Sequence, residues 1–140
     1  MVIRVCNEQD EAMVPVNRMV QLARRAVRAL RIRTPGTLAI AFIGSRRIRS
    51  LNKRFLRHDR ATDVLSFRYD GEPVVGEILI APARARAYAR RHRLPYEEEL
   101  SRYVVHGLLH WMGHEDRTRA QQCKMRCLED QLLRQCVRVR

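Results

Sequence analysis

The spacing of apolar residues along the chain predicts four β-strands and five α-helices. Residues 1–6 alternate between apolar and polar positions, whereas 37–43 form an almost continuous apolar run, typical of a strand inside a sheet. Further strands are expected at 62–67 and 76–80, and the short connection between them favours an antiparallel pair. Helical spacing is found over residues 15–31, 45–55, 82–92, 95–112 and 119–136. This order predicts a single α/β (α+β) domain over residues 1–140, with a small mixed sheet of about four strands packed with about five helices.

One predicted helix departs from the amphipathic pattern. Almost every residue from Tyr103 to Met112 is apolar, so this segment is expected to be buried nearly all round. His106 and His110 nevertheless lie inside it, one turn apart and on the same face. Burying two imidazoles among apolar side chains needs a compensating partner, and two histidines at this spacing can bind one metal ion. The alternative is a pair of hydrogen-bonded core histidines.

The residues after this helix supply candidates for a third ligand. Gly113 is suited to the left-handed position that ends a helix and turns the chain back. His114, Glu115 and Asp116 then compete: continuation of the helix favours His114, whereas reversal at Gly113 favours Asp116. Three protein ligands with an open position are more typical of a catalytic zinc site than of a structural one.

The net charge of the chain indicates what kind of partner it binds. Lysine and arginine number 28 against 15 acidic residues, which gives a net charge of +13 and points to a polyanion, most often nucleic acid. Between Asn17 and Arg60 there are thirteen basic residues and one acid, Asp59. The helices at 15–31 and 45–55 and the loop at 56–61 are therefore predicted to form a phosphate-contacting surface. The alternative is an organism whose proteins are generally rich in arginine.

Cysteines and hydropathy favour a cytoplasmic protein. No targeting segment or membrane-spanning apolar run is evident, and the four cysteines form no Cys-x-x-Cys pair. Cys123 and Cys127 share a helical face and are expected to pack as small apolar groups.

The candidate metal site suits hydrolysis of a peptide or a phosphodiester. Zinc held by two histidines and an aspartate lowers the pKa of bound water and polarises a substrate oxygen. In the His-Glu-x-x-His peptidases, the residue after the first histidine is the general base, and here that residue is Gly107. The missing base and the basic surface together favour a nuclease over a peptidase.

Two motifs resemble the YbeY family. They are His106-Gly107-x-Leu109-His110-x-x-Gly113-x-x-Asp116, and the pair Thr62-Asp63-Val64-Leu65-Ser66-Phe67 and Gly76-Glu77-Ile78. The resemblance implies a YbeY-like α/β fold with the metal at one end of a groove. It also implies a single-strand-specific endoribonuclease with one Zn²⁺ per chain, in which metal-activated water attacks an RNA phosphodiester. The implied role is rRNA maturation, at the 3′ end of 16S rRNA, and ribosome quality control. The implied partners are rRNA, the small ribosomal subunit and ribosomal proteins.

This chain departs from the family pattern at two positions. The commonest pattern has a third histidine where this chain has Asp116, but one branch has aspartate, so the metal ligands are assigned as His106, His110 and Asp116, with His114 as the alternative. The family places a functional arginine directly after an aromatic residue, whereas here Arg57 comes two residues after Phe55. Arg57 is assigned to RNA binding; the alternative is an ordinary surface arginine.

Other roles stay open at this point. No general base is assigned, although Glu115 is a nearby candidate. Asp63 and Ser66 have functional or backbone-satisfying roles, and Glu77 either lines the groove or pairs with an arginine. Two other functions remain: a ribosome-associated RNA-binding or assembly factor with a mainly structural zinc, and a metallopeptidase, which Gly107 disfavours.

Overall fold

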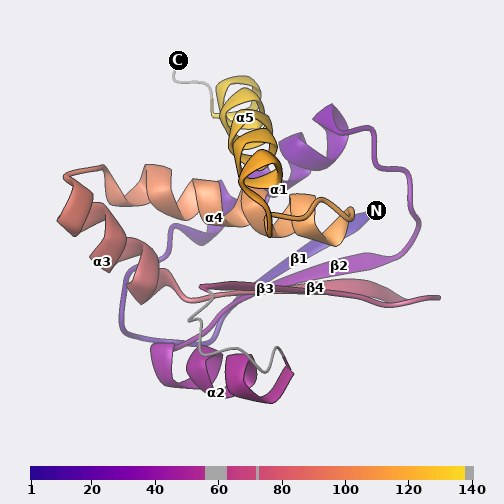
Figure 1. Ribbon diagram of the computed structural model, residues 1–140. Helices are drawn as coiled ribbons and strands as arrows, with labels where there is room; N and C mark the ends of the chain where they lie inside the picture. The colour runs from indigo at the N-terminus through magenta and orange to yellow at the C-terminus, as the bar shows by residue number, and fades with distance from the viewer. Residues whose placement is uncertain (56–62, 72, 138–140) are drawn as a thin grey trace.

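A four-stranded sheet carries helices on both of its faces in the computed structural model, which describes residues 1–55, 63–71 and 73–137 (Figure 1). The strands are β1 (Val2–Asn7), β2 (Thr37–Phe42), β3 (Val64–Arg68) and β4 (Val74–Ile80). The helices are α1 (Val16–Ala29), α2 (Ser45–Phe55), α3 (Pro82–His92), α4 (Tyr96–Trp111) and α5 (Arg119–Cys136). The predicted elements and their order are confirmed.

The sheet has the order β1-β2-β4-β3 and is mixed, as predicted. β1 and β4 both run parallel to β2, while β3 returns antiparallel to β4 at one edge. β2 and β4 are central, and β4 is buried on both faces because helices cover it from both sides. The antiparallel β3 brings the Asp63 end of its strand next to the last residues of β4, as the register Val64↔Ile80 shows.

The main core lies between the sheet and α1, α4 and α5 (Figure 1). Leu38, Ile40 and Phe42 alternate along β2 and all face this layer, which is the period-two pattern of a strand with one fully buried face. α4 runs through the middle of the layer, with Val104 and Leu109 fully buried. The prediction that this helix, which bears both histidines, is buried nearly all round is confirmed.

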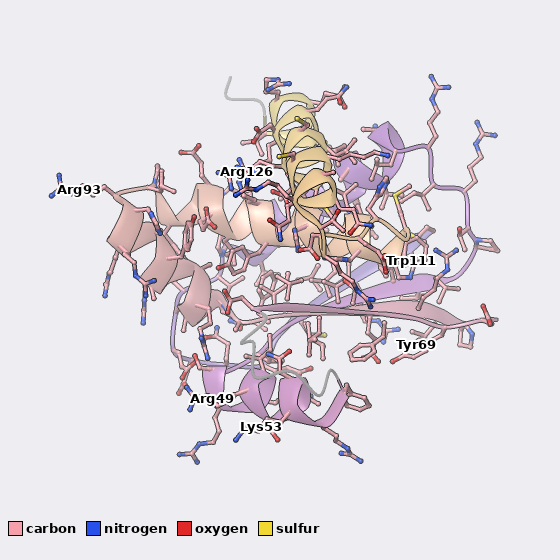
Figure 2. All side chains as sticks on the ribbon, in the orientation of Figure 1. Arg49, Lys53, Tyr69, Arg93, Trp111 and Arg126 are labelled. Carbon is pink, nitrogen blue, oxygen red and sulfur yellow. The ribbon has the colours of Figure 1, made fainter. Side chains whose placement is uncertain are left out.

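α2 packs alone on the opposite face of the sheet (Figure 1). Its Ile48 joins a second, smaller apolar cluster with Leu65 and Leu79. Arg49 and Lys53 project away from the sheet (Figure 2). The prediction of one phosphate-contacting surface built from the first two helices is wrong, because the sheet lies between α1 and α2. Residues 56–61 of that prediction lie outside the described residues.

Two glycines allow α4 to lie very close to the sheet. A Cβ on Gly76 would be 2.1 Å from Nε1 of Trp111, and a Cβ on Gly107 would be 2.4 Å from Cγ2 of Ile78. The Trp111 indole donates a 3.0 Å hydrogen bond to the Val75 carbonyl, so it cannot move away without losing that bond. These contacts hold the C-terminal end of α4 against β4.

In the described part of the chain, no helix is long and apolar enough to cross a membrane.

All four cysteines are free. Cys123 and Cys127 are exposed, so the prediction that they pack as apolar groups is wrong. The buried stripe of α5 includes Met125 and Leu132. Cys123 and Cys127 each lie two residues from Met125, which places them on the opposite, exposed side of the helix.

Candidate metal centre

A tight turn at Gly113 reverses the chain immediately after the second histidine. Gly113 has φ 107°, the left-handed conformation that the sequence predicted. Its N–H donates to the His110 carbonyl at 2.9 Å, and the N–H of His114 donates to the Leu109 carbonyl at 3.0 Å. This pair of hydrogen bonds is the Schellman motif. The reversal directs Asp116 back toward the end of α4.

The turn brings together the three predicted ligands. Nε2 of His106 lies 3.5 Å from Oδ2 of Asp116, and Nε2 of His110 lies 3.4 Å from Oδ1 of the same carboxylate. One donor atom from each of the three residues lies within 4.8 Å of the other two. The two imidazole rings meet edge to face, with their centroids 4.5 Å apart. His114 is not part of this group, and it lines a separate hollow of about 220 Å³ beside Gly113.

These distances fit a shared ion better than direct hydrogen bonds. Hydrogen bonds between nitrogen and oxygen are normally about 2.7–3.2 Å long, shorter than either His–Asp distance. Ligands about 2.0–2.1 Å from a tetrahedral Zn²⁺ are about 3.3–3.4 Å from one another. Two nitrogens and one carboxylate also match the donor set of catalytic zinc sites, and their three positions leave the fourth free. The residues present therefore fit a zinc ion.

The protonation state of His110 also suits metal binding. Burial lowers the pKa of His110, and the neighbouring His106 lowers it further, while Asp116 and the backbone of His114 act in the opposite direction. A lowered pKa keeps the imidazole neutral at pH 7, so its nitrogen lone pair is available to a ligand.

A buried carboxylate that the sequence analysis missed supports the centre from α5. Glu129 has a side chain only 6% exposed, and its Oε2 accepts a 2.5 Å hydrogen bond from Nδ1 of His106. Its other oxygen pairs with Arg102 at 2.9 Å. The signal was present in the sequence, because Glu129 occupies the same helical stripe as the apolar Met125 and Leu132. A buried acid needs a hydrogen-bonding or ionic partner, and a histidine that serves as this partner is a candidate metal ligand.

The three residues line a groove of about 780 Å³. One wall comes from β3 and the residue before it, another from α4, and a third from α5 and the turn that precedes it, with Tyr88 of α3 also contributing. Five acids line it: Asp63, Glu99, Glu115, Asp116 and Glu129; the basic residues are Arg102, Arg117 and Arg126. The groove thus carries a formal charge of −2 within a chain of +13, and a divalent cation would neutralise it.

The motif residues left open in the sequence analysis have distinct positions. Ser66 donates a 2.6 Å hydrogen bond from its hydroxyl to the Gly107 carbonyl, so it satisfies helix backbone. Asp63 lines the groove and accepts a 3.0 Å hydrogen bond from Tyr103. Glu77 accepts a 2.6 Å hydrogen bond from Tyr69, and among the described residues it neither lines the groove nor pairs with an arginine. The pKa of Tyr69 is raised to about 12, mainly by this hydrogen bond and secondly by desolvation through burial.

The remaining candidates from the sequence are Glu115 and Arg57. Glu115 is exposed and lines the groove, so it stays a candidate base. Arg57, assigned to RNA binding, lies outside the described residues.

An α/β domain with an open His–His–Asp group in a groove is typical of metal-dependent hydrolases. The chain belongs to the YbeY family: the family model described as Endoribonuclease YbeY matches residues 4–137. The protein named Endoribonuclease YbeY from Flavobacterium psychrophilum is 36% identical over 103 residues, which cover 73% of this chain and 74% of that protein. Its namesake from Anaeromyxobacter sp. is 33% identical over 138 residues, covering 96% and 71% of the two chains.

A solved structure has the same fold. The solution structure of a Thermotoga maritima protein matches with a TM-score of 0.61 and 25% identity, and the match covers 94% of this chain and 89% of that one. The family resemblance and the fold class expected from the sequence are thus confirmed, and the chain is placed among the hydrolases.

Proposed function

We propose that this chain is a single-strand-specific, zinc-dependent endoribonuclease that acts in rRNA maturation, at the 3′ end of 16S rRNA, and in ribosome quality control. The observation that carries the proposal is the convergence of His106, His110 and Asp116 in a groove of a YbeY-family chain. The proposed unit is one domain over residues 1–140, working in the cytoplasm on the small ribosomal subunit. The reducing conditions there suit its four free cysteines.

The described residues have separate tasks in this proposal. His106, His110 and Asp116 hold one zinc ion, which when bound lowers the pKa of water and polarises a phosphoryl oxygen. The groove walls, which come from β3, α4 and α5, position a single strand of RNA for cleavage. No general base is assigned; Glu115 lines the groove and is exposed to solvent.

The charge of the groove suggests an order of binding. Phosphates are repelled by the net charge of −2 in the groove until a divalent ion balances it. RNA is therefore first held by basic residues outside the groove. We assign this contact to Arg57 and to exposed residues of α2, among them Arg49 and Lys53, which point away from the sheet (Figure 2).

Metal content tests the zinc site directly. We expect elemental mass spectrometry to find about one zinc per wild-type chain, since the donor set matches one tetrahedral ion. Asp116→Ala should lose most of it, because two histidines alone leave the ion half coordinated. The matched control is His114→Ala, which changes a residue of the same turn outside the ligand group and should keep its zinc.

Other outcomes would change the assignment. Zinc kept by Asp116→Ala and lost by His114→Ala would make His114 the third ligand. A wild-type chain that binds no zinc would contradict the zinc-dependent enzyme and favour an RNA-binding assembly factor.

Salt dependence tests the proposed phosphate contact of Arg57. We expect Arg57→Ala to weaken binding of all single-stranded RNA sequences to a similar extent, and to reduce the slope of log K against log salt by about 0.7. Arg134→Ala, which removes an exposed arginine of α5 outside the groove, is the control and should leave the slope nearly unchanged. Equal slopes for wild type and Arg57→Ala would make Arg57 an ordinary surface residue.

A further inference from the structure

Glu129 is a buried charged residue with no task in the reaction described above. It lies on α5, in the wall of the groove, and its backbone and side chain together are only 5% exposed. The positions one turn before and one turn after it on the same face, Met125 and Leu132, are apolar and buried. An apolar side chain at position 129 would continue the stripe.

Both carboxylate oxygens of Glu129 have partners. Oε2 accepts from Nδ1 of His106 at 2.5 Å, while Oε1 accepts from the Arg102 guanidinium at 2.9 Å. Arg102 is held in turn by Asp130 through a 2.7 Å contact. The carboxylate is therefore fixed between a cation and an imidazole, and its position is set by α4 and α5 together.

Stability alone does not account for such a group. Removing a carboxylate and a guanidinium from water costs several kcal/mol per ion, and their attraction in the interior roughly offsets that cost. Replacing a buried ion pair by apolar residues of similar volume is often neutral or stabilising. The presence of Glu129 on an apolar stripe is better explained by what it does to His106.

The hydrogen bond to Glu129 determines which nitrogen of His106 carries the proton. An ionised carboxylate can only accept, so the hydrogen lies on Nδ1. In a neutral imidazole the lone pair is then on Nε2, the atom that lies 3.5 Å from Oδ2 of Asp116. The carboxylate also prevents rotation of the ring away from Asp116, because rotation would break the 2.5 Å bond.

We propose that Glu129, itself held by Arg102, is a positioning residue that orients His106 so that Nε2 faces the ion. This inference rests on the metal site of the proposed function. It also makes the site depend on α5: His106 comes from α4, Asp116 from the connection, and Glu129 from α5. Metal affinity is thus coupled to the packing of α5 on α4.

The test is the zinc affinity of purified full-length variants, measured by competition with a chromophoric chelator at pH 7.5. We expect Glu129→Gln to bind zinc about 10–100-fold more weakly than the wild type. A glutamine amide has an NH₂ donor and a carbonyl acceptor. In either orientation its NH₂ group faces another donor, which is the Arg102 guanidinium in one case and Nδ1–H of His106 in the other. RNA cleavage is not needed for this readout.

Glu99→Gln is the matched control. Glu99 is a buried glutamate that lines the same groove and sits on α4, so the substitution removes the same charge at similar burial. Its zinc affinity should stay within about threefold of the wild type. Thermal unfolding of both metal-free variants shows whether any change in affinity follows a general loss of stability.

A second measurement uses only the wild-type chain. Nitrogen-15 NMR of the zinc-free protein at pH 8 is expected to show His106 protonated on Nδ1. This result decides the question even if Glu129→Gln fails to fold. An Nε2-protonated His106 would overturn the inference.

The outcomes separate this inference from the proposed function. Zinc binding by the wild type with an unchanged affinity in Glu129→Gln would overturn the positioning role and leave the zinc enzyme intact. An equal loss in Glu129→Gln and Glu99→Gln would show a general effect of groove charge and overturn the specific role. Absence of zinc binding in the wild type would overturn the proposed function itself.

Discussion

Replacing His110 with alanine is expected to abolish RNA cleavage while RNA binding is retained. Loss of one of three ligands removes the ion and with it several kcal/mol of transition-state stabilisation. Each 1.4 kcal/mol is about a tenfold change in rate, so cleavage of a single-stranded RNA should fall by about a thousandfold or more. Binding should change by no more than about threefold, because the basic face of α2 lies on the other side of the sheet.

The control for this variant is His92→Ala. His92 is an exposed histidine at the end of α3 that stacks on Tyr88 and lies outside the ligand group. Cleavage and binding should both stay close to wild type in His92→Ala. The measurements are initial cleavage rates with zinc present and a gel-shift titration with the same RNA.

The same pair of assays separates the competing functions. If cleavage, binding and folding all fail in His110→Ala, zinc is structural and the assembly-factor function is favoured. Unchanged cleavage would remove His110 from the reaction altogether. A casein digestion by the wild type is expected to show no peptide cleavage, and cleavage there would revive the metallopeptidase.

Gly107→Ala is expected to destabilise the fold by about 2–3 kcal/mol, the upper part of the range for overpacked cores. The new Cβ would lie 2.4 Å from Cγ2 of Ile78 and 3.0 Å from Cγ1 of Val64. Both neighbours are buried β-branched side chains and cannot turn aside freely. Alanine favours a helix over glycine by about 1 kcal/mol, which is too little to offset the overlap. Urea unfolding of the metal-free protein measures the difference.

Gly44→Ala is the control for this substitution. A Cβ at Gly44 would meet Oε1 of Glu11 at 3.6 Å, an ordinary contact, so the change in stability should stay within about 0.5 kcal/mol. Similar stabilities for Gly107→Ala and Gly44→Ala would show that α4 moves away from β4 without cost. A separate loss of zinc affinity in Gly107→Ala would follow from a shift of His106, the adjacent residue.

The close approach of α4 to the sheet at Gly107 gives a packing reason for glycine at this position. In the His-Glu-x-x-His peptidases, the glutamate base occupies the position that Gly107 has in this chain. In the structure, a Cβ at residue 107 would overlap Ile78 and press against Val64 of the sheet. Glycine is therefore required here by packing, and its identity by itself says nothing about the reaction.

Local features of the site were predicted because they depend on neighbours in the chain. His106 and His110 share a face through helical periodicity, and the left-handed Gly113 follows from the freedom of a residue without a Cβ. Asp116 came within reach because the Gly113 turn spans only a few residues. The strands and helices were predicted because their apolar residues recur with periods of about two and 3.6.

Tertiary structure alone decided the contacts between distant segments. Glu129 meets His106 across 23 residues, and Ser66 meets Gly107 across 41. The sheet also separates α1 from α2. The many arginines of these two helices had led to the prediction that they form one surface. The sequence by itself determined the elements, the histidine pair and the turn, because backbone propensity and periodicity are local. The support of the site, the shape of the groove and the face presented by each basic helix followed only from packing, because they depend on how α4, α5 and the sheet meet.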